Sequence, residues 1–136
     1  SRVPLQVTSA LKKALTEAGV EAVKPAYIGV LLCLWAEDEL KAVELARRSR
    51  LEPSTITGLL DRMERDGLVT RAPDPHDRRA FRIGLTDAGR RVKPSTLQVT
   101  QRVLDRYFAG IPAADLAVTL QVLQQVLTNV EGEPPP

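Results

Sequence analysis

Aromatic residues are scarce in this 136-residue chain, where Phe, Trp and Tyr together make up 4% of the sequence. Hydrophobic residues as a whole make up 43%, so the core must consist mainly of Leu, Val, Ile and Ala, which favours packed helices. Cys33 is the single cysteine, which excludes an internal disulfide framework. The length fits one domain, or one domain with a tail.

Other absences exclude several kinds of site. His76 is the single histidine, so no multi-histidine metal site can form. The chain has no nucleophile–base pair and no phosphate-cradling glycine loop, so we expect no catalysis and no cofactor. The longest apolar run, YIGVLLCLWA, is about half of what a bilayer requires. We therefore expect a soluble, cytoplasmic protein with no membrane partner.

Charge is distributed unevenly along the chain. Residues 41–93 carry 13 Lys+Arg and 8 Asp+Glu, a net charge of +5, and the remaining residues carry 6 and 9, a net charge of −3. A basic middle between acidic ends indicates a segment that faces a polyanion. Chance clustering is the alternative explanation for a difference of this size.

Apolar residues spaced three and four positions apart predict a largely helical chain. The expected helices span Val7–Gly19 and residues 25–40, 41–49, 53–66, 86–109 and 111–130. On the second, third and fourth helices, the side chains expected to face the core are Ile28, Leu31, Leu32 and Trp35; Val43, Leu45 and Ala46; and Ile56, Leu59, Leu60 and Met63. In the last helix, a coiled-coil-like line of apolar residues predicts a dimer interface, formed by Leu116, Leu120, Leu123, Leu127 and Val130.

Between the fourth and fifth helices the pattern changes to that of strands. Leu68–Pro73 and Ala80–Thr86 are rich in β-branched and alternating residues and are separated by DPHDRR, which predicts a β-hairpin. Asp66 and Gly67 fit either a hairpin turn or the end of the preceding helix, and the helical spacing before them favours the helix end. Thr86 is expected to cap the next helix, and Pro94 predicts a kink or break within it.

The helix over 53–66 has an outer face suited to the major groove of DNA. The outer face of its first half is small and rich in hydroxyl groups, because it carries Ser54, Thr57 and Gly58. The backbone of this helix can therefore approach DNA closely, and the hydroxyl groups can reach base edges or phosphates. Thr55 and Arg62 lie on the flanks, and Arg65 adds charge near the end. Glycine costs about 1 kcal/mol relative to alanine inside a helix. Close approach of DNA and simple drift at an exposed position both explain Gly58.

The tip of the predicted hairpin concentrates arginine. Arg78, Arg79 and Arg82 are suited to the strong negative potential of a narrow minor groove, with Asp77 placed to hold a guanidinium. The alternative is a solvated tip in which Asp77 merely forms a turn. Taken alone, the composition of the tip favours this alternative.

Residues Glu44–Arg90 resemble the MarR family of bacterial transcription regulators. The similarity is carried by ELA in the third helix, by STITGLLDRMERDGLVTR, and by the pattern D-x-R-x-x-x-[V/I]-x-L-T, which is matched by Asp77, Arg79, Ile83, Leu85 and Thr86. The resemblance implies a mostly α fold with a small β-hairpin wing, namely a winged helix-turn-helix with N- and C-terminal dimerisation helices. Residues 1–24 would then be a dimerisation helix, 25–88 the DNA-binding lobe, 89–130 the C-terminal dimerisation helices and 131–136 a disordered tail.

The same resemblance implies a function. It implies a homodimer that represses transcription from a near-palindromic operator in double-stranded DNA and is released by a small aromatic or acidic effector. It places Arg79 in the minor groove with support from Asp77, and places the groove contacts at Ser54, Thr55, Thr57 and Arg62. Two departures are notable: Gly58 stands where many members have a basic or polar residue, and the third helix lacks a Ser or Thr cap.

Two other functional classes stay open at this point. One is a winged-helix module that docks to proteins and has only non-specific affinity for DNA. The other is a dimerising fragment of an enzyme, for which 136 residues leave no room for a catalytic domain. Cys33 fits either a small apolar core residue or a redox switch, and its apolar neighbours favour the first.

Overall fold

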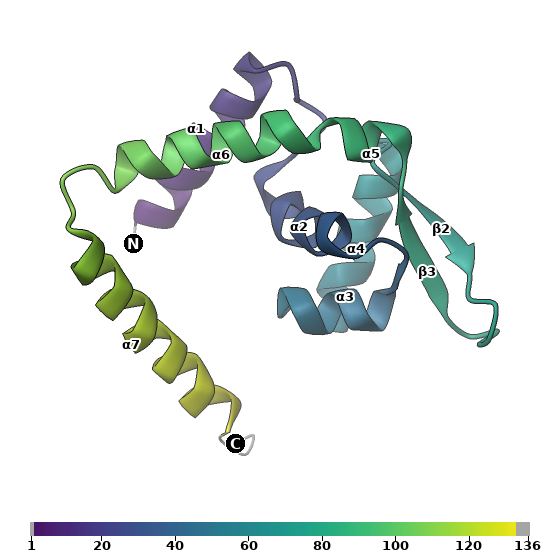
Figure 1. Ribbon diagram of the computed structural model, residues 1–136. Helices are drawn as coiled ribbons and strands as arrows, with labels where there is room; N and C mark the ends of the chain where they lie inside the picture. The colour runs from purple at the N-terminus through teal and green to yellow at the C-terminus, as the bar shows by residue number, and fades with distance from the viewer. Residues whose placement is uncertain (1, 133–136) are drawn as a thin grey trace. The chain divides into compact units, whose positions relative to one another are not determined.

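The computed structural model describes residues 2–132 and divides after Val103 into two compact units. The first unit contains α1 (Val3–Glu17), a 3₁₀ turn (Pro25–Tyr27), α2 (Ile28–Ala36), β1 (Leu40–Lys41), α3 (Ala42–Ser49), α4 (Pro53–Arg65), β2 (Val69–Pro73), β3 (Phe81–Leu85) and α5 (Asp87–Arg91). Helix α6 (Lys93–Tyr107) begins in this unit, and α7 (Ala113–Glu131) lies in the second. The mostly helical fold with a small hairpin was predicted from the sequence, and Figure 1 shows the hairpin projecting from the helices α2 to α5.

One aliphatic core holds the first unit together, as the shortage of aromatic residues predicted. Helices α2, α3 and α4 pack in succession, and α4 also contacts β2. The largest side chains that are fully buried come from α1 to α4 and from the hairpin: Leu15, Leu31, Leu34, Leu45, Leu60, Met63, Leu68 and Ile83. This packing fixes the orientation of α4, because its whole apolar face is committed to the core.

The sheet is antiparallel with the strand order β1-β3-β2. The predicted hairpin is confirmed, with Val69 opposite Leu85 and Pro73 opposite Phe81. Strand β1 was missed, because two residues are too few to show an alternating pattern. The sequence predicts that the second helix extends to residue 40, whereas α2 ends at Ala36.

The chain turns as its local signals predicted in three places. Gly67 has φ +78° after α4 ends, a left-handed conformation that favours glycine, so the helix-end interpretation is confirmed. The hydroxyl of Thr86 accepts a hydrogen bond from the N–H of Gly89 at 2.9 Å and caps α5. The expected break before Pro94 separates α5 from α6 at Val92. In contrast, α1 begins at Val3, four residues before its predicted start.

Two predictions about buried faces are wrong. In α2, Leu32 is 47% exposed, whereas Val30 and Leu34 are buried beside Leu31. Nearly every residue of α2 is apolar, so the spacing of apolar residues cannot distinguish one face from another. In α3, Val43 is 76% exposed, because the inward line runs through Leu45 and Ala46.

The second unit contains the end of α6 and helix α7. Helix α7 was predicted over residues 111–130 and ends at Glu131, the first residue of the segment expected to be a disordered tail. Residues 133–136 of that tail lie outside the described residues.

Candidate DNA interface

Helix α4 presents the predicted polar face to solvent. Ile56, Leu59, Leu60 and Met63 are all buried, as their spacing predicted. The opposite face therefore carries the candidate groove contacts: Ser54, Thr55, Thr57, Arg62 and Arg65 are exposed, and Gly58 is half-buried. The hydroxyl of Thr57 donates to the carbonyl oxygen of Pro53 at 2.9 Å, so its free lone pairs can still accept.

The protein itself does not need glycine at position 58. A Cβ atom built on Gly58 meets no other atom within 4 Å. Close packing inside the chain therefore cannot explain this glycine. Close approach of another molecule and drift at a tolerant position both stay open.

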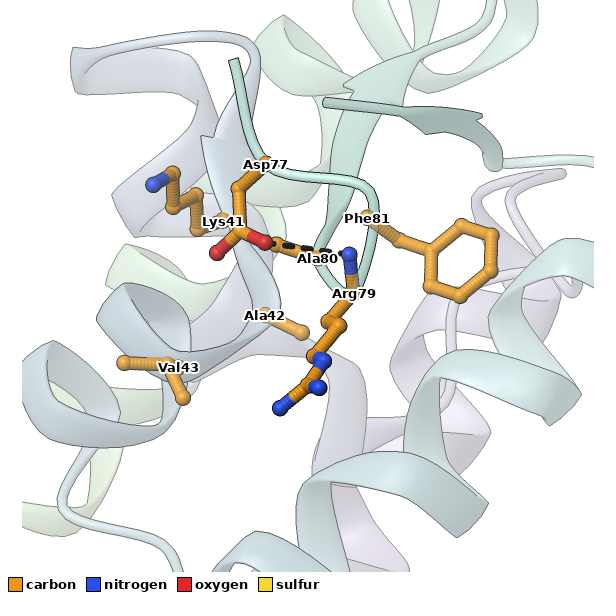
Figure 2. Close-up of a pocket in the computed structure, with 7 residues that line it drawn as sticks. All are labelled: Lys41, Ala42, Val43, Asp77, Arg79, Ala80 and Phe81. Carbon is orange, nitrogen blue, oxygen red and sulfur yellow. Dashed lines mark hydrogen bonds between the residues drawn. The ribbon is translucent and has the colours of Figure 1, made fainter. Parts of the chain in front are cut away.

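The tip of the wing is a closed turn. The N–H of Asp74 donates to the carbonyl oxygen of Ala80 at 3.0 Å. The N–H of Ala80 donates to the carbonyl oxygen of Asp77 at 3.1 Å. The carboxylate of Asp77 accepts the backbone N–H of Arg79 at 3.0 Å (Figure 2). Asp77 thus holds the backbone of Arg79, and its support of the guanidinium in a minor groove stays a prediction. The contact that forms is local, between residues two positions apart.

A cleft of about 340 Å³ separates the wing from the start of α3. Its lining comes from two segments, shown as sticks in Figure 2: Lys41, Ala42, Val43, Asp77, Arg79, Ala80 and Phe81. Within the described part of the chain, no carboxylate forms an ion pair with the guanidinium groups of Arg78 and Arg79, which are exposed. These two cations can therefore pair with an external anion without breaking a bond.

Arg82 has a different role from the two arginines at the tip. Its Nε donates to Oδ2 of Asp74 at 2.8 Å, and the side chain of Asp74 is fully buried. The other oxygen of Asp74 accepts the N–H of His76 at 2.8 Å, and Arg82 also reaches the carbonyl oxygen of Glu39 at 3.4 Å. This ion pair fixes the end of the wing where β2 enters the turn at the tip. The sequence did not predict this pair, although Asp followed by Pro is a turn signal.

These contacts predict how the stability of the wing depends on pH. The hydrogen bonds from Arg82 and from the backbone of His76 lower the pKa of Asp74 to about 2. An unfolded Asp has a pKa of about 3.9, so the ionised carboxylate stabilises the fold above that pH. This stabilisation is lost as the pH falls from about 4 toward 2.

We therefore expect Asp74→Asn to flatten the pH dependence of the unfolding free energy across this window. Urea denaturation at several pH values between 5 and 2 measures the unfolding free energy of each protein and its dependence on pH. Asp77→Asn, on the same loop but exposed, is the matched control. If the unfolding free energies of the wild type and Asp74→Asn have the same slope against pH, the ion pair contributes nothing to the pH dependence of stability.

A second ion pair that the sequence did not reveal joins the wing to α4. Arg71 of β2 contacts the carboxylate of Asp61 at 2.5 Å. Asp61 lies on α4 and Arg71 on β2, ten positions later, so the packing of β2 against α4 brings the two side chains together. Of the remaining candidates, His76 is exposed at the tip, and Cys33 is half-buried against the core, which agrees with a packing role.

The predicted line of apolar residues on α7 lies at the surface of the second unit. Leu120, Leu123, Leu127 and Val130 are exposed, and Leu116 is half-buried. Across residues 2–132, no cluster of His, Cys, Asp and Glu could hold a metal ion. Among the same residues, no helix has the length and apolarity needed to span a bilayer.

Comparisons with known proteins agree with this geometry. The MarR family model matches residues 25–81, which run from the turn before α2 into β3. The transcriptional repressor MdtR of Bacillus subtilis is 33% identical over 113 residues, covering 83% of this chain and 73% of MdtR. A MarR family regulator from Rhodococcus sp. RHA1 aligns with a TM-score of 0.73 and 32% identity, over 92% of this chain and 86% of that chain.

A third relative has been solved with two kinds of ligand. CouR from Rhodococcus jostii RHA1, solved with p-coumaroyl-CoA, is 29% identical with a TM-score of 0.73, over 92% of this chain and 86% of its own. CouR bound to a 23-mer DNA duplex aligns with a TM-score of 0.78 and 25% identity, over 93% and 87%. Together with the exposed face of α4 and the cationic wing, these similarities show that the chain belongs to the MarR family of DNA-binding transcription regulators.

Proposed function

We propose that this protein is a repressor that binds a near-palindromic operator as a homodimer. Each protomer places α4 in a major groove and the tip of its wing at the neighbouring minor groove. The contacts proposed on α4 are Ser54, Thr55, Thr57, Gly58, Arg62 and Arg65, and those on the wing are Arg78 and Arg79, with Asp77 shaping the turn. The proposal is carried by one observation: the polar face of α4 is exposed beside a wing whose Arg78 and Arg79 form no ion pair with any carboxylate among residues 2–132.

Dimerisation is supported by the surface of α7. The exposed side chains on this helix include Leu120, Leu123 and Leu127. Contiguous apolar surface of this kind marks an interface. We propose that this line, with Leu116, packs against the terminal helices of a second copy, and that residues 1–24 and 89–130 together form the dimerisation region. Two half-sites about one helical turn apart would match the twofold symmetry of the dimer.

We further propose that a small effector releases the protein from its operator. The support is the ligand held by CouR, an aromatic acyl thioester, which favours an aromatic or acidic effector. Release requires that the effector bind better to the conformation that does not fit DNA. We also propose that the protein works in a reducing cytoplasm. Cys33 is its single cysteine, so the chain has no internal disulfide that would require an oxidising compartment.

Fluorescence anisotropy tests the proposal directly. The purified full chain is titrated onto DNA from upstream of its own gene and onto a scrambled duplex, each at two salt concentrations. Tighter binding to the native DNA that persists at the higher salt is the expected result. Equal binding that collapses in salt would mean that the basic surface only attracts polyanions, and would favour a module that docks to proteins.

Removing the guanidinium of Arg79 should weaken operator binding. We expect Arg79→Ala to cost about 1–3 kcal/mol of specific binding free energy, the usual contribution of one good DNA contact. The same anisotropy titration measures the loss. Arg91→Ala, which removes an equal charge from an exposed position on α5, is the control. If the two variants lose equal affinity, the wing has no specific role.

A further inference from the structure

Helix α4 carries an unexpected acidic group on its outer face. Asp61 follows Gly58 by one turn and is 60% exposed at its side chain. It lies between the hydroxyl-rich first half of α4 and the arginines near its end. A carboxylate is repelled by the phosphates of DNA. On a surface that faces DNA, Asp61 is therefore stabilised only if hydrogen-bond donors of the protein or of the bases contact it.

Arg71 fixes the orientation of this carboxylate. Its Nη2 donates to Oδ1 of Asp61 at 2.5 Å and lies 3.4 Å from the carbonyl oxygen of Thr57. The side chain of Arg71 is 29% exposed and its Nε is buried, so the guanidinium lies against α4. Among residues 2–132, Oδ1 takes the bond from Arg71 and Oδ2 forms no hydrogen bond. Asp61 therefore offers one oriented oxygen to an external donor.

The surface of α4 one turn before Asp61 is open. Gly58 has no side chain, and an added Cβ would meet nothing within 4 Å. A base edge can approach α4 here more closely than beside a longer side chain. This gives the glycine a use that packing inside the protein does not provide.

An ionised carboxylate accepts hydrogen bonds and donates none. In the major groove, the donors are the amino groups at N4 of cytosine and N6 of adenine, whereas O6 and N7 of guanine and O4 of thymine accept. We propose that Asp61, oriented by Arg71, is a specificity-determining residue that requires an amino-bearing base at the position it faces in each half-site. Guanine or thymine there would set one acceptor against another. This inference rests on the proposed role of α4 as the helix that reads the groove.

The test uses the duplex from the upstream region that the full chain binds most tightly. Every single base-pair substitution of that duplex competes for binding to the wild type and to Asp61→Asn. The asparagine amide both donates and accepts, so it tolerates either kind of base edge. At one symmetry-related position, the wild type should prefer amino-bearing bases by about tenfold or more, as expected for a hydrogen bond to a charged group. Asp61→Asn should lose that preference and keep the others.

Two further variants separate base recognition from charge and from folding. Asp61→Glu keeps an acceptor-only group and should retain a preference for amino-bearing bases at the same position. Glu64→Gln removes an equal charge from the next turn of α4 and should leave every base preference unchanged. Thermal unfolding of each variant shows whether it is folded in the assay.

The outcomes are distinguishable from failure of the proposed function. If Asp61→Asn changes the affinity of all duplexes by one common factor, Asp61 acts only through its charge and the inference is overturned. If the wild type binds operator and scrambled DNA equally, α4 does not read sequence, and the proposed function fails before Asp61 is tested.

Discussion

A glutamate in place of Leu123 is expected to convert the protein to monomers and to abolish operator binding. Leu123 lies at the centre of the apolar line on α7, where its side chain is exposed in the single chain. In the proposed dimer this side chain is buried, and an unpaired carboxylate buried there would cost several kcal/mol. Because operator affinity depends on two linked half-sites, losing the dimer removes most of it. Light scattering after gel filtration gives the mass, and anisotropy gives the affinity.

Gln121→Glu is the matched control, because it adds the same charge to α7 on the side away from Leu123. It should stay dimeric and bind DNA as the wild type does. A Leu123→Glu protein that also stays dimeric would refute the assigned interface. The second apolar line on α7, formed by Val118, Val122 and Val126, would then be the next surface to test.

The largest loss of stability from one added carbon atom is expected at Gly89. A Cβ atom at this position would lie 2.2 Å from the carbonyl oxygen of Leu68 and 3.1 Å from Cδ2 of Leu85. The oxygen belongs to the backbone at the start of the hairpin and cannot rotate away. Its position is fixed further because it accepts the N–H of Thr86 at 3.1 Å. We expect Gly89→Ala to reduce the unfolding free energy by about 3 kcal/mol, as for a severe case of overpacking.

Urea denaturation followed by circular dichroism measures this loss. Gly58→Ala supplies the comparison, since its added Cβ meets no atom and alanine is favoured over glycine inside a helix by about 1 kcal/mol. We therefore expect Gly58→Ala to be as stable as the wild type or more so. Equal stability of the two variants would mean that the contact between α5 and the hairpin relaxes freely.

The sequence predicted those parts of the fold that depend on residues close together in the chain. The buried face of α4 follows from four apolar residues at helical spacing, and the cap at Thr86 follows from a single hydroxyl before a helix. The inward face of α2 could not be predicted, because its residues are apolar on all sides. Strand β1 forms only because β3 lies beside it, with Leu40 opposite Ile83.

The candidate site shows the same limit. Resemblance pointed to Arg79 and Asp77 from a local pattern, and the turn between the Asp77 carboxylate and the N–H of Arg79 was the alternative that composition favoured. The pair Asp74–Arg82 links residues eight positions apart across the hairpin, and the pair Asp61–Arg71 links residues ten positions apart between α4 and β2. Which arginine is free and which is paired therefore depends on tertiary placement, although composition showed that arginine is abundant there.

The contact of Trp35 with α5 has a practical consequence. Its indole N–H donates to the carbonyl oxygen of Gly89 at 2.9 Å, and the chain contains no other tryptophan. All tryptophan emission therefore comes from one indole, half-buried where α2 meets the segment that follows the wing. A shift in that emission when DNA or a small molecule is added would report movement at this junction. The protein thus contains an intrinsic optical probe, and its response can be recorded without attaching a dye.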